Sequence, residues 1–79
     1  MEPVQPDKQV LIDIVSTKMP FGKYKGRLIC DLPETYLVWF KNKGFPPGKL
    51  GELMANTYEF QLNGLMPLLY KIKSIVRKY

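Results

Sequence analysis

The chain has 79 residues, with 12 Lys and Arg against seven Asp and Glu, a net charge of +5 and 46% hydrophobic residues. A domain takes about 100–150 residues, so residues 1–79 are expected to form one small basic domain. The sequence has no His and one Cys, which excludes Ser-His-Asp and Cys-His catalysis, zinc sites with four Cys or His ligands, and a disulfide within the chain.

The first predicted element is a helix over residues 7–17, and residues 1–6 before it are expected to be flexible. Apolar residues recur four apart, as from Val10 to Ile14, a spacing that places them on one face of a helix. Asp7 is expected to cap this helix. The β-branched residues would also fit a strand, but a helix is the favoured interpretation.

Residues 19–31 form the segment in which we expect β-structure. Gly22 and Gly26 bracket three residues of this segment, and glycine permits the positive φ angles of a tight turn. Residues 21–23 and 27–30 would then be two short antiparallel strands, which have to pack on helices to be stable. The predicted fold class is therefore α+β, a short antiparallel β-hairpin packed with about four α-helices.

Residues 32–79 are expected to be helical. A second helix would begin at Asp31, whose side chain would cap it, and would end at Gly44 in a positive-φ conformation. Pro and Gly residues at 45–48 predict a rigid turn. A third helix would run over 49–62 and end at another glycine cap.

The last predicted helix, residues 65–76, has the most regular apolar pattern of the chain, with apolar residues at i, i+3, i+4 and i+7. These residues are Leu65, Leu68, Leu69, Ile72, Ile75 and Val76. Lysines 71 and 78 would flank one edge of this stripe, and Lys73 and Arg77 the other. Such a basic amphipathic helix also fits an anionic membrane or an acidic groove. A domain of this size needs the stripe for its own core, however, so a core helix is the favoured interpretation.

Large aromatic side chains are expected to supply much of the core. Phe21 and Trp39 are predicted to be buried, because such side chains dominate core burial in small domains. For Tyr24, burial and an exposed contact role are equally expected. Cys30 is predicted to be a small buried apolar residue.

Positive charge concentrates in two blocks of the sequence. Residues 18–27 contain four cationic residues and no acidic one, and residues 63–79 also contain four and none. An uneven distribution of this kind indicates an anionic partner. The alternative is that both blocks are merely solvated surface.

The first block contains the candidate binding residues. Lys23 and Lys25 are two apart and would project from the same face of an extended segment. Tyr24 lies between them and would project from the opposite face, unless the turn twists it round. Surfaces that bind single-stranded nucleic acid use cations for the phosphates and aromatic rings to stack on the bases. The predicted nucleic-acid-binding residues are Lys23, Tyr24, Lys25, Arg27, Lys18 and Lys49.

A series of ordered motifs gives the chain a family resemblance. The segment 19–26 has the sequence MPFGKYKG and is followed by Asp31-Leu32-Pro33, Tyr36-Leu37, Trp39-Phe40, Gly44, Pro46, Gly48, Leu50-Gly51, Glu59 and Asn63-Gly64-Leu65. With these motifs, residues 10–70 resemble a small bacterial family of unknown function described as "putative quorum-sensing-regulated virulence factor". The shorter pattern that begins at 21–26 is similar to the accessory C-terminal module of some proofreading-type exonucleases, which implies DNA as a ligand.

The predicted function is that of a non-enzymatic, basic binding module, with nucleic acid as the favoured ligand. One alternative is a protein-interaction adaptor that uses the helix of Tyr36, Trp39 and Phe40, or the turn at Pro46 and Pro47. Another is a virulence-associated regulatory protein, or a remnant of a nuclease, that acts beside a partner enzyme.

No catalytic residues, metal or cofactor are expected. The acidic residues are better explained as helix caps, for Asp31 and Glu34, and as an exposed helical face, for Glu52 and Glu59. A cytoplasmic location without membrane contact is expected, because no apolar run approaches the roughly 20 residues of a membrane span. The N-terminal residues also lack the pattern of a secretory signal.

Overall fold

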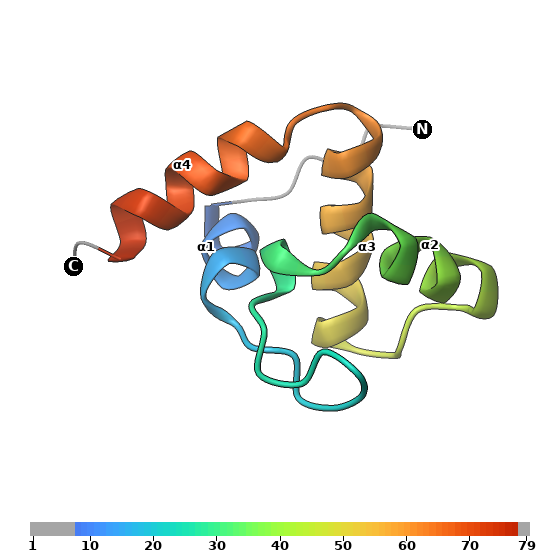
Figure 1. Cartoon of the computed structure of the whole chain (residues 1–79). Helices are drawn as coiled ribbons and strands as arrows, with labels where there is room; N and C mark the ends of the chain where they lie inside the picture. The colour runs from blue at the N-terminus through green and yellow to red at the C-terminus, as the bar shows by residue number, and fades with distance from the viewer. Residues whose placement is uncertain (1–7, 78–79) are drawn as a thin grey trace.

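The computed structural model describes residues 8–77, which form four α-helices and one short 3₁₀ turn (Figure 1). In chain order these elements are α1 (Lys8–Ser16), η1 (Ile29–Asp31), α2 (Glu34–Lys43), α3 (Lys49–Leu62) and α4 (Met66–Arg77). All four helices agree with the sequence prediction to within about three residues at each end. The predicted Asp7 cap, the flexible segment 1–6 and Lys78 lie outside the described residues.

The α+β prediction is wrong, because residues 8–77 form no strand and the expected hairpin is a loop. A single antiparallel bridge, between Lys18 and Leu28, closes this loop. Toward the tip of the loop, the backbone hydrogen bonds are those of local turns. The Lys25 N–H donates to the Gly22 carbonyl (3.2 Å) and the Arg27 N–H to the Tyr24 carbonyl (3.0 Å). Two hydrogen bonds cross the base of the loop, from the Met19 N–H to the Arg27 carbonyl (2.7 Å) and from the Gly26 N–H to the Met19 carbonyl (2.8 Å). These bonds and the turn hydrogen bonds together order the loop without forming a strand.

The core is mainly aliphatic. It contains Val10, Ile14, Val15, Met19, Ile29, Cys30, Leu32, Leu37, Leu53, Met54, Phe60 and Leu69. The buried positions of α3 include Leu53, Met54 and Thr57, and the Thr57 hydroxyl donates to the Leu53 carbonyl (2.8 Å). The prediction that Cys30 is a small buried apolar residue is confirmed.

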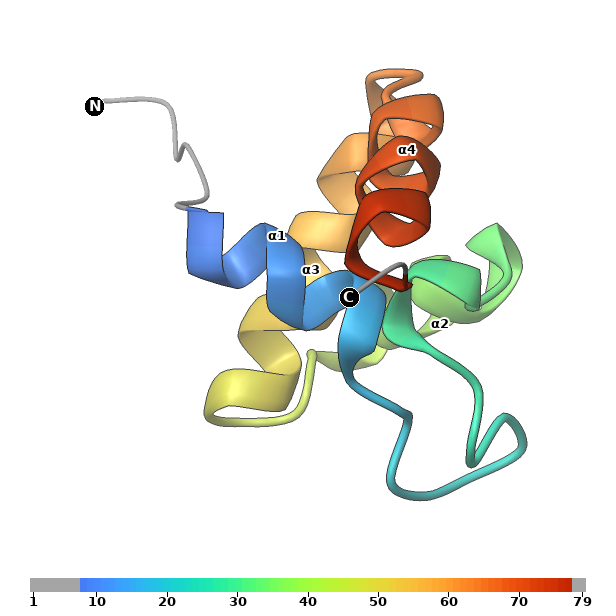
Figure 2. The ribbon, with the colours of Figure 1, turned by 90° about the vertical axis from the view of Figure 1, so that its left-hand side faces the viewer.

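The prediction that Phe21 and Trp39 are core residues is wrong, since their side chains are 45% and 53% exposed. Phe21 lies in the loop, which projects from the helical body (Figure 2). Helix α2 lies against α3 and buries one residue completely, Leu37. Trp39 is two positions further on, about 200° around the helix, so it faces outward.

Asp31 does not cap α2, contrary to the prediction. The N-cap position is Pro33, which makes no side-chain hydrogen bond to the helix. Asp31 lies in η1 instead, where its Oδ2 atom is 2.8 Å from Lys73 Nζ of α4. The end of the helix is as predicted: Gly44 has φ 101°, and its N–H donates to the Phe40 carbonyl.

Helix α4 packs against α1 and also contacts η1, and its predicted apolar stripe is only half buried (Figure 2). Leu69 is fully buried, and Ile72 and Val76 pack partly against the core. Leu65, Leu68 and Ile75 remain exposed. The apolar stripe is wider than the surface that α1 and η1 cover. The prediction that α4 is a core helix is therefore correct for one side of the stripe and wrong for the other. None of the described helices is long and apolar enough to cross a membrane.

The buried thiol of Cys30 predicts a pH dependence of stability. Burial, and then the negative charge of Asp31, raise the pKa of Cys30 from 9.0 to about 11. Below pH 9 both the folded and the unfolded states keep the thiol protonated. Between pH 9 and 11 only the unfolded state loses the proton, so the stability that this group contributes is lost as pH rises.

The expected loss between pH 8 and 10.5 is about 2 kcal/mol of unfolding free energy. Because lysines and tyrosines titrate in the same range, the measurement is the difference between the parent and Cys30→Ala in urea denaturation at both pH values. The parent should lose about 2 kcal/mol more than the variant. Equal losses would show that the thiol ionises in the folded state as readily as in the unfolded one.

Candidate nucleic-acid interface

The loop between α1 and η1 presents the predicted cations to solvent. Lys23, Lys25 and Arg27 are exposed along it, and Lys18 is exposed at its base, beside the bridge to Leu28. None of the ion pairs found within residues 8–77 includes any of these four cations. The loop therefore carries an uncompensated positive charge, which is suited to phosphate contacts.

Tyr24 anchors this loop to the helical body. Its ring centroid lies 4.7 Å from that of Tyr36 in α2, in an edge-to-face arrangement at 73°, and its side chain is half-buried against the core. Lys23 Nζ and Arg27 Cζ each lie over the Tyr24 ring, 5.5 Å from its centroid. Tyr24 thus holds two cations in place by cation–π contacts, and its ring is less open to a stacking base than the sequence suggested.

The ring contacts continue along α2 as an aromatic row, made up of Tyr24, Tyr36, Phe40 and Trp39. The centroids of Tyr36 and Phe40 are 5.1 Å apart and those of Phe40 and Trp39 5.0 Å apart, both edge to face. Partial burial, and then the neighbouring Tyr24, raise the pKa of the Tyr36 hydroxyl above its usual 10.0. The Tyr36 hydroxyl is therefore uncharged at neutral pH. The row ends at the half-exposed Trp39.

The binding residues predicted from the sequence did not include three residues of this surface, Phe21, Trp39 and Lys43. Lys43 Nζ lies 6.0 Å from the centroid of the Trp39 ring, so a further cation accompanies the exposed end of the row. The signal was present in the sequence, because an aromatic residue and a lysine four apart lie on the same face of a helix. The assignment of Trp39 to the core concealed it.

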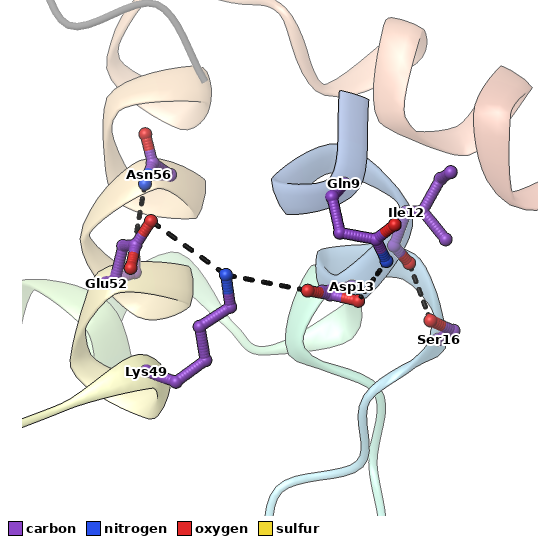
Figure 3. Close-up of polar contacts among 7 residues, drawn as sticks. All are labelled: Gln9, Ile12, Asp13, Ser16, Lys49, Glu52 and Asn56. Atoms are coloured by element: carbon purple, nitrogen blue, oxygen red, sulfur yellow. Dashed lines mark hydrogen bonds and ion pairs between the residues drawn. The ribbon is translucent and has the colours of Figure 1, made fainter. Parts of the chain in front are cut away.

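Lys49 does not join the loop cations. Its Nζ atom lies 3.5 Å from Asp13 Oδ2 in α1 and 4.0 Å from Glu52 Oε1 one turn along α3 (Figure 3). Gln9 Nε2 donates to the other oxygen of Asp13 (2.9 Å). In Figure 2 the first turn of α3 and the loop tip lie well apart. Lys49 thus connects α3 to α1, and the structure does not place it with Lys23, Lys25 and Arg27.

The arrangement offers groups for two kinds of binding contact. The loop offers cations for phosphates, and the exposed rings of Phe21 and Trp39 offer faces for bases. Within residues 8–77, no group of three His, Cys, Asp or Glu residues is close enough to hold a metal ion. The chemistry that this surface supports is electrostatic and stacking contact with an anionic, aromatic ligand.

Comparisons with known proteins agree with the motif resemblance. A family model described as "Putative quorum-sensing-regulated virulence factor" matches residues 7–72. The chain is also similar to the uncharacterized protein YpeB of Escherichia coli, in strain K12 and in O157:H7, with 54% identity over 68 residues in each case. These matches cover 85% of this chain and 94% of each relative. No solved structure matches the chain significantly.

Proposed function

We propose that this chain, which belongs to the family described as "Putative quorum-sensing-regulated virulence factor", is a non-enzymatic binding module for single-stranded nucleic acid. The observation that supports this most directly is the cationic loop held against an aromatic row. Lys23 and Arg27 both lie over Tyr24, and the row leads from Tyr24 to the exposed Trp39. A reducing compartment such as the cytoplasm suits the single buried thiol.

A single strand fits this surface better than a duplex does. The loop cations can contact phosphates of either form, but bases are open to stacking only where they are unpaired. Trp39 and Phe21, each about half exposed, are the rings that can take part. The similarity of the loop motif to an exonuclease module points to the same ligand class and stays a prediction.

The first test measures how binding depends on salt. Three phosphate contacts to a single strand imply a slope near about −2 in a plot of log affinity against log salt, at about 0.7 per contact. Replacing Lys23 and Lys25 together by Gln should flatten the slope to about −0.7 and leave the melting temperature nearly unchanged. The control is the pair Lys8→Gln and Lys71→Gln, which removes the same charge from exposed positions in α1 and α4.

The second test uses Trp39, the single Trp of the sequence, as its own probe. Stacking of a base should quench its fluorescence, and Trp39→Ala should weaken binding by about 1–3 kcal/mol without altering the salt slope. Tyr70→Ala is the control, because Tyr70 is similarly exposed but lies on α4.

The contrary outcome favours the protein-interaction adaptor. If millimolar oligonucleotide at low salt neither quenches Trp39 nor shifts the amide resonances of the loop, the nucleic-acid proposal is wrong. The half-exposed Trp39 would then be the central contact of a protein interface, a role for which Trp is well suited. Binding of that kind would respond little to salt.

A further inference from the structure

Helix α4 carries exposed apolar side chains that the fold does not use. Leu68 and Ile75 are 45% and 52% exposed, and they lie seven residues apart, on the same side of the helix. The neighbouring Leu69, Ile72 and Val76 face the core. The apolar stripe of α4 is thus split between the core and an open flank.

The position of the open flank of α4 follows from the contact that the other side of this helix makes with η1. Lys73 pairs with Asp31 in η1 at 2.8 Å, which fixes one side of α4 against η1. Leu68 and Ile75 are about 140–160° around the helix from Lys73, so they lie on the flank toward α1. Helix α1, against which α4 packs, carries another exposed apolar residue, Ile12, which Figure 3 shows on the side of α1 turned away from Lys49.

The resulting α1–α4 seam consists of Ile12, Leu68 and Ile75, with the cations Lys8 and Lys71 beside them. Lys8 is one turn before Ile12, and Lys71 lies between Leu68 and Ile75 on the helix surface. Both lysines are exposed. The sequence of α4 contains no acidic residue, and Asp13, the one acid of α1, is engaged by Gln9 and Lys49 on another side.

We propose that the α1–α4 seam docks an acidic amphipathic helix of a partner protein. A helix that brings Leu or Ile side chains at i, i+4 and i+7 would cover the three apolar residues of the seam. Glu or Asp residues at its edges would face Lys8 and Lys71, so the charges would be complementary. This surface is separate from the aromatic row, and the proposal does not depend on nucleic-acid binding.

Two other occupants of the seam are less suitable, a second copy of this chain because of its charge and a lipid surface because the open apolar surface is small. A second copy of this chain, docked through the same seam about a two-fold axis, would bring Lys8 and Lys71 toward the same lysines. A lipid surface would engage only the three open apolar side chains, because the rest of the stripe is turned into the core. An interfacial helix inserts a whole apolar face instead.

The test uses the full chain and two synthetic 18-residue peptides that differ only in charge. Both carry Leu at i, i+4 and i+7, and their flanking positions are Glu in one and Lys in the other. The Glu peptide should bind and should shift the amide resonances of Ile12, Leu68, Lys71 and Ile75. The Lys peptide should not bind.

Variants with matched controls locate the contact. Ile75→Ser should weaken binding of the Glu peptide about tenfold, while Tyr70→Ser should not, since Tyr70 is 49% exposed on the other side of the same helix. Lys71→Glu should weaken it as well, and Lys25→Glu, with the same charge change in the loop, should not. Lys71→Glu keeps the test decisive if Ile75→Ser lowers stability.

Several results would overturn the proposal. No binding of the Glu peptide would do so, as would equal effects of the seam variants and their controls. Sedimentation that shows a dimer lost in Ile75→Ser would identify a second copy as the occupant. Binding to phosphatidylglycerol vesicles that is lost in Ile75→Ser, without peptide binding, would identify a lipid surface.

Discussion

Gly51→Ala is expected to lower the free energy of unfolding by at least about 2 kcal/mol, although Ala is the better helix former by about 1 kcal/mol. Gly51 is buried in the first turn of α3. A Cβ at this position would overlap the Pro46 carbonyl oxygen and lie 2.9 Å from the carbonyl carbon. The obstacle is the backbone carbonyl of Pro46, whose dihedral angles are restricted by the rings of Pro46 and Pro47. It therefore cannot rotate away as a side chain would.

Urea denaturation followed by circular dichroism checks this expectation. Glu59→Ala is the control, because Glu59 is exposed in the same helix and its replacement should change stability by less than about 0.5 kcal/mol. A stabilised Gly51→Ala protein would mean that the 45–48 turn does not pack against α3 as described.

Leu69→Ala is expected to lower the free energy of unfolding by about 2–5 kcal/mol, and Leu68→Ala by less than about 1 kcal/mol. The two leucines are adjacent in α4 and differ in environment, since Leu69 is fully buried and Leu68 is 45% exposed. Truncation at 69 leaves a cavity between α4 and α1, whereas truncation at 68 leaves none. Ile72→Ala, at a partly buried position, should fall between them.

Thermal and urea unfolding of the two leucine variants form a matched pair. A small domain has a total stability of about 5–15 kcal/mol at most, so Leu69→Ala is expected to be partly unfolded at 37 °C. Equal losses at the two positions would contradict the assignment of the buried and open sides of α4.

The helices could be predicted from the sequence because each has a clear period and a clear end. Gly44, for example, closes α2 with the positive φ that its position predicts. The loop could not be predicted, because the glycines that permit a hairpin turn permit other turns equally well. The outcome depends on which carbonyl each N–H reaches, and Lys25 N–H reaches Gly22 within the same turn.

The sequence predicted the exposure of the charged residues of the candidate site better than that of its aromatic residues. Lys23, Lys25 and Arg27 are exposed as expected, since charged side chains stay in water unless they are paired. The exposure of Trp39 depends on how much of α2 its neighbours cover, which is a property of the packing and not of the helix itself. Aliphatic residues such as Ile29 and Met54 fill the core instead.

The least predictable features join residues far apart in the chain. Asp31 has the local pattern of a helix cap, but its carboxylate accepts a hydrogen bond from Lys73, 42 residues later in the chain. Lys49 has the pattern of a free surface cation, but Asp13 of α1 lies 3.5 Å away. Both pairings require the packed arrangement of α1, η1, α3 and α4, which no local pattern contains.

The packing of α4 against α1 also has a consequence for biosynthesis. Helix α1 is translated well before α4, yet it packs against α4, and its apolar side chains Val10, Ile14 and Val15 belong to the same core as Leu69 of α4. Until the ribosome has released α4, these apolar side chains stay accessible to chaperones and to other nascent chains. Cooperative folding of this domain therefore has to wait for the synthesis of α4, and its speed depends on closing the loop between α1 and α4.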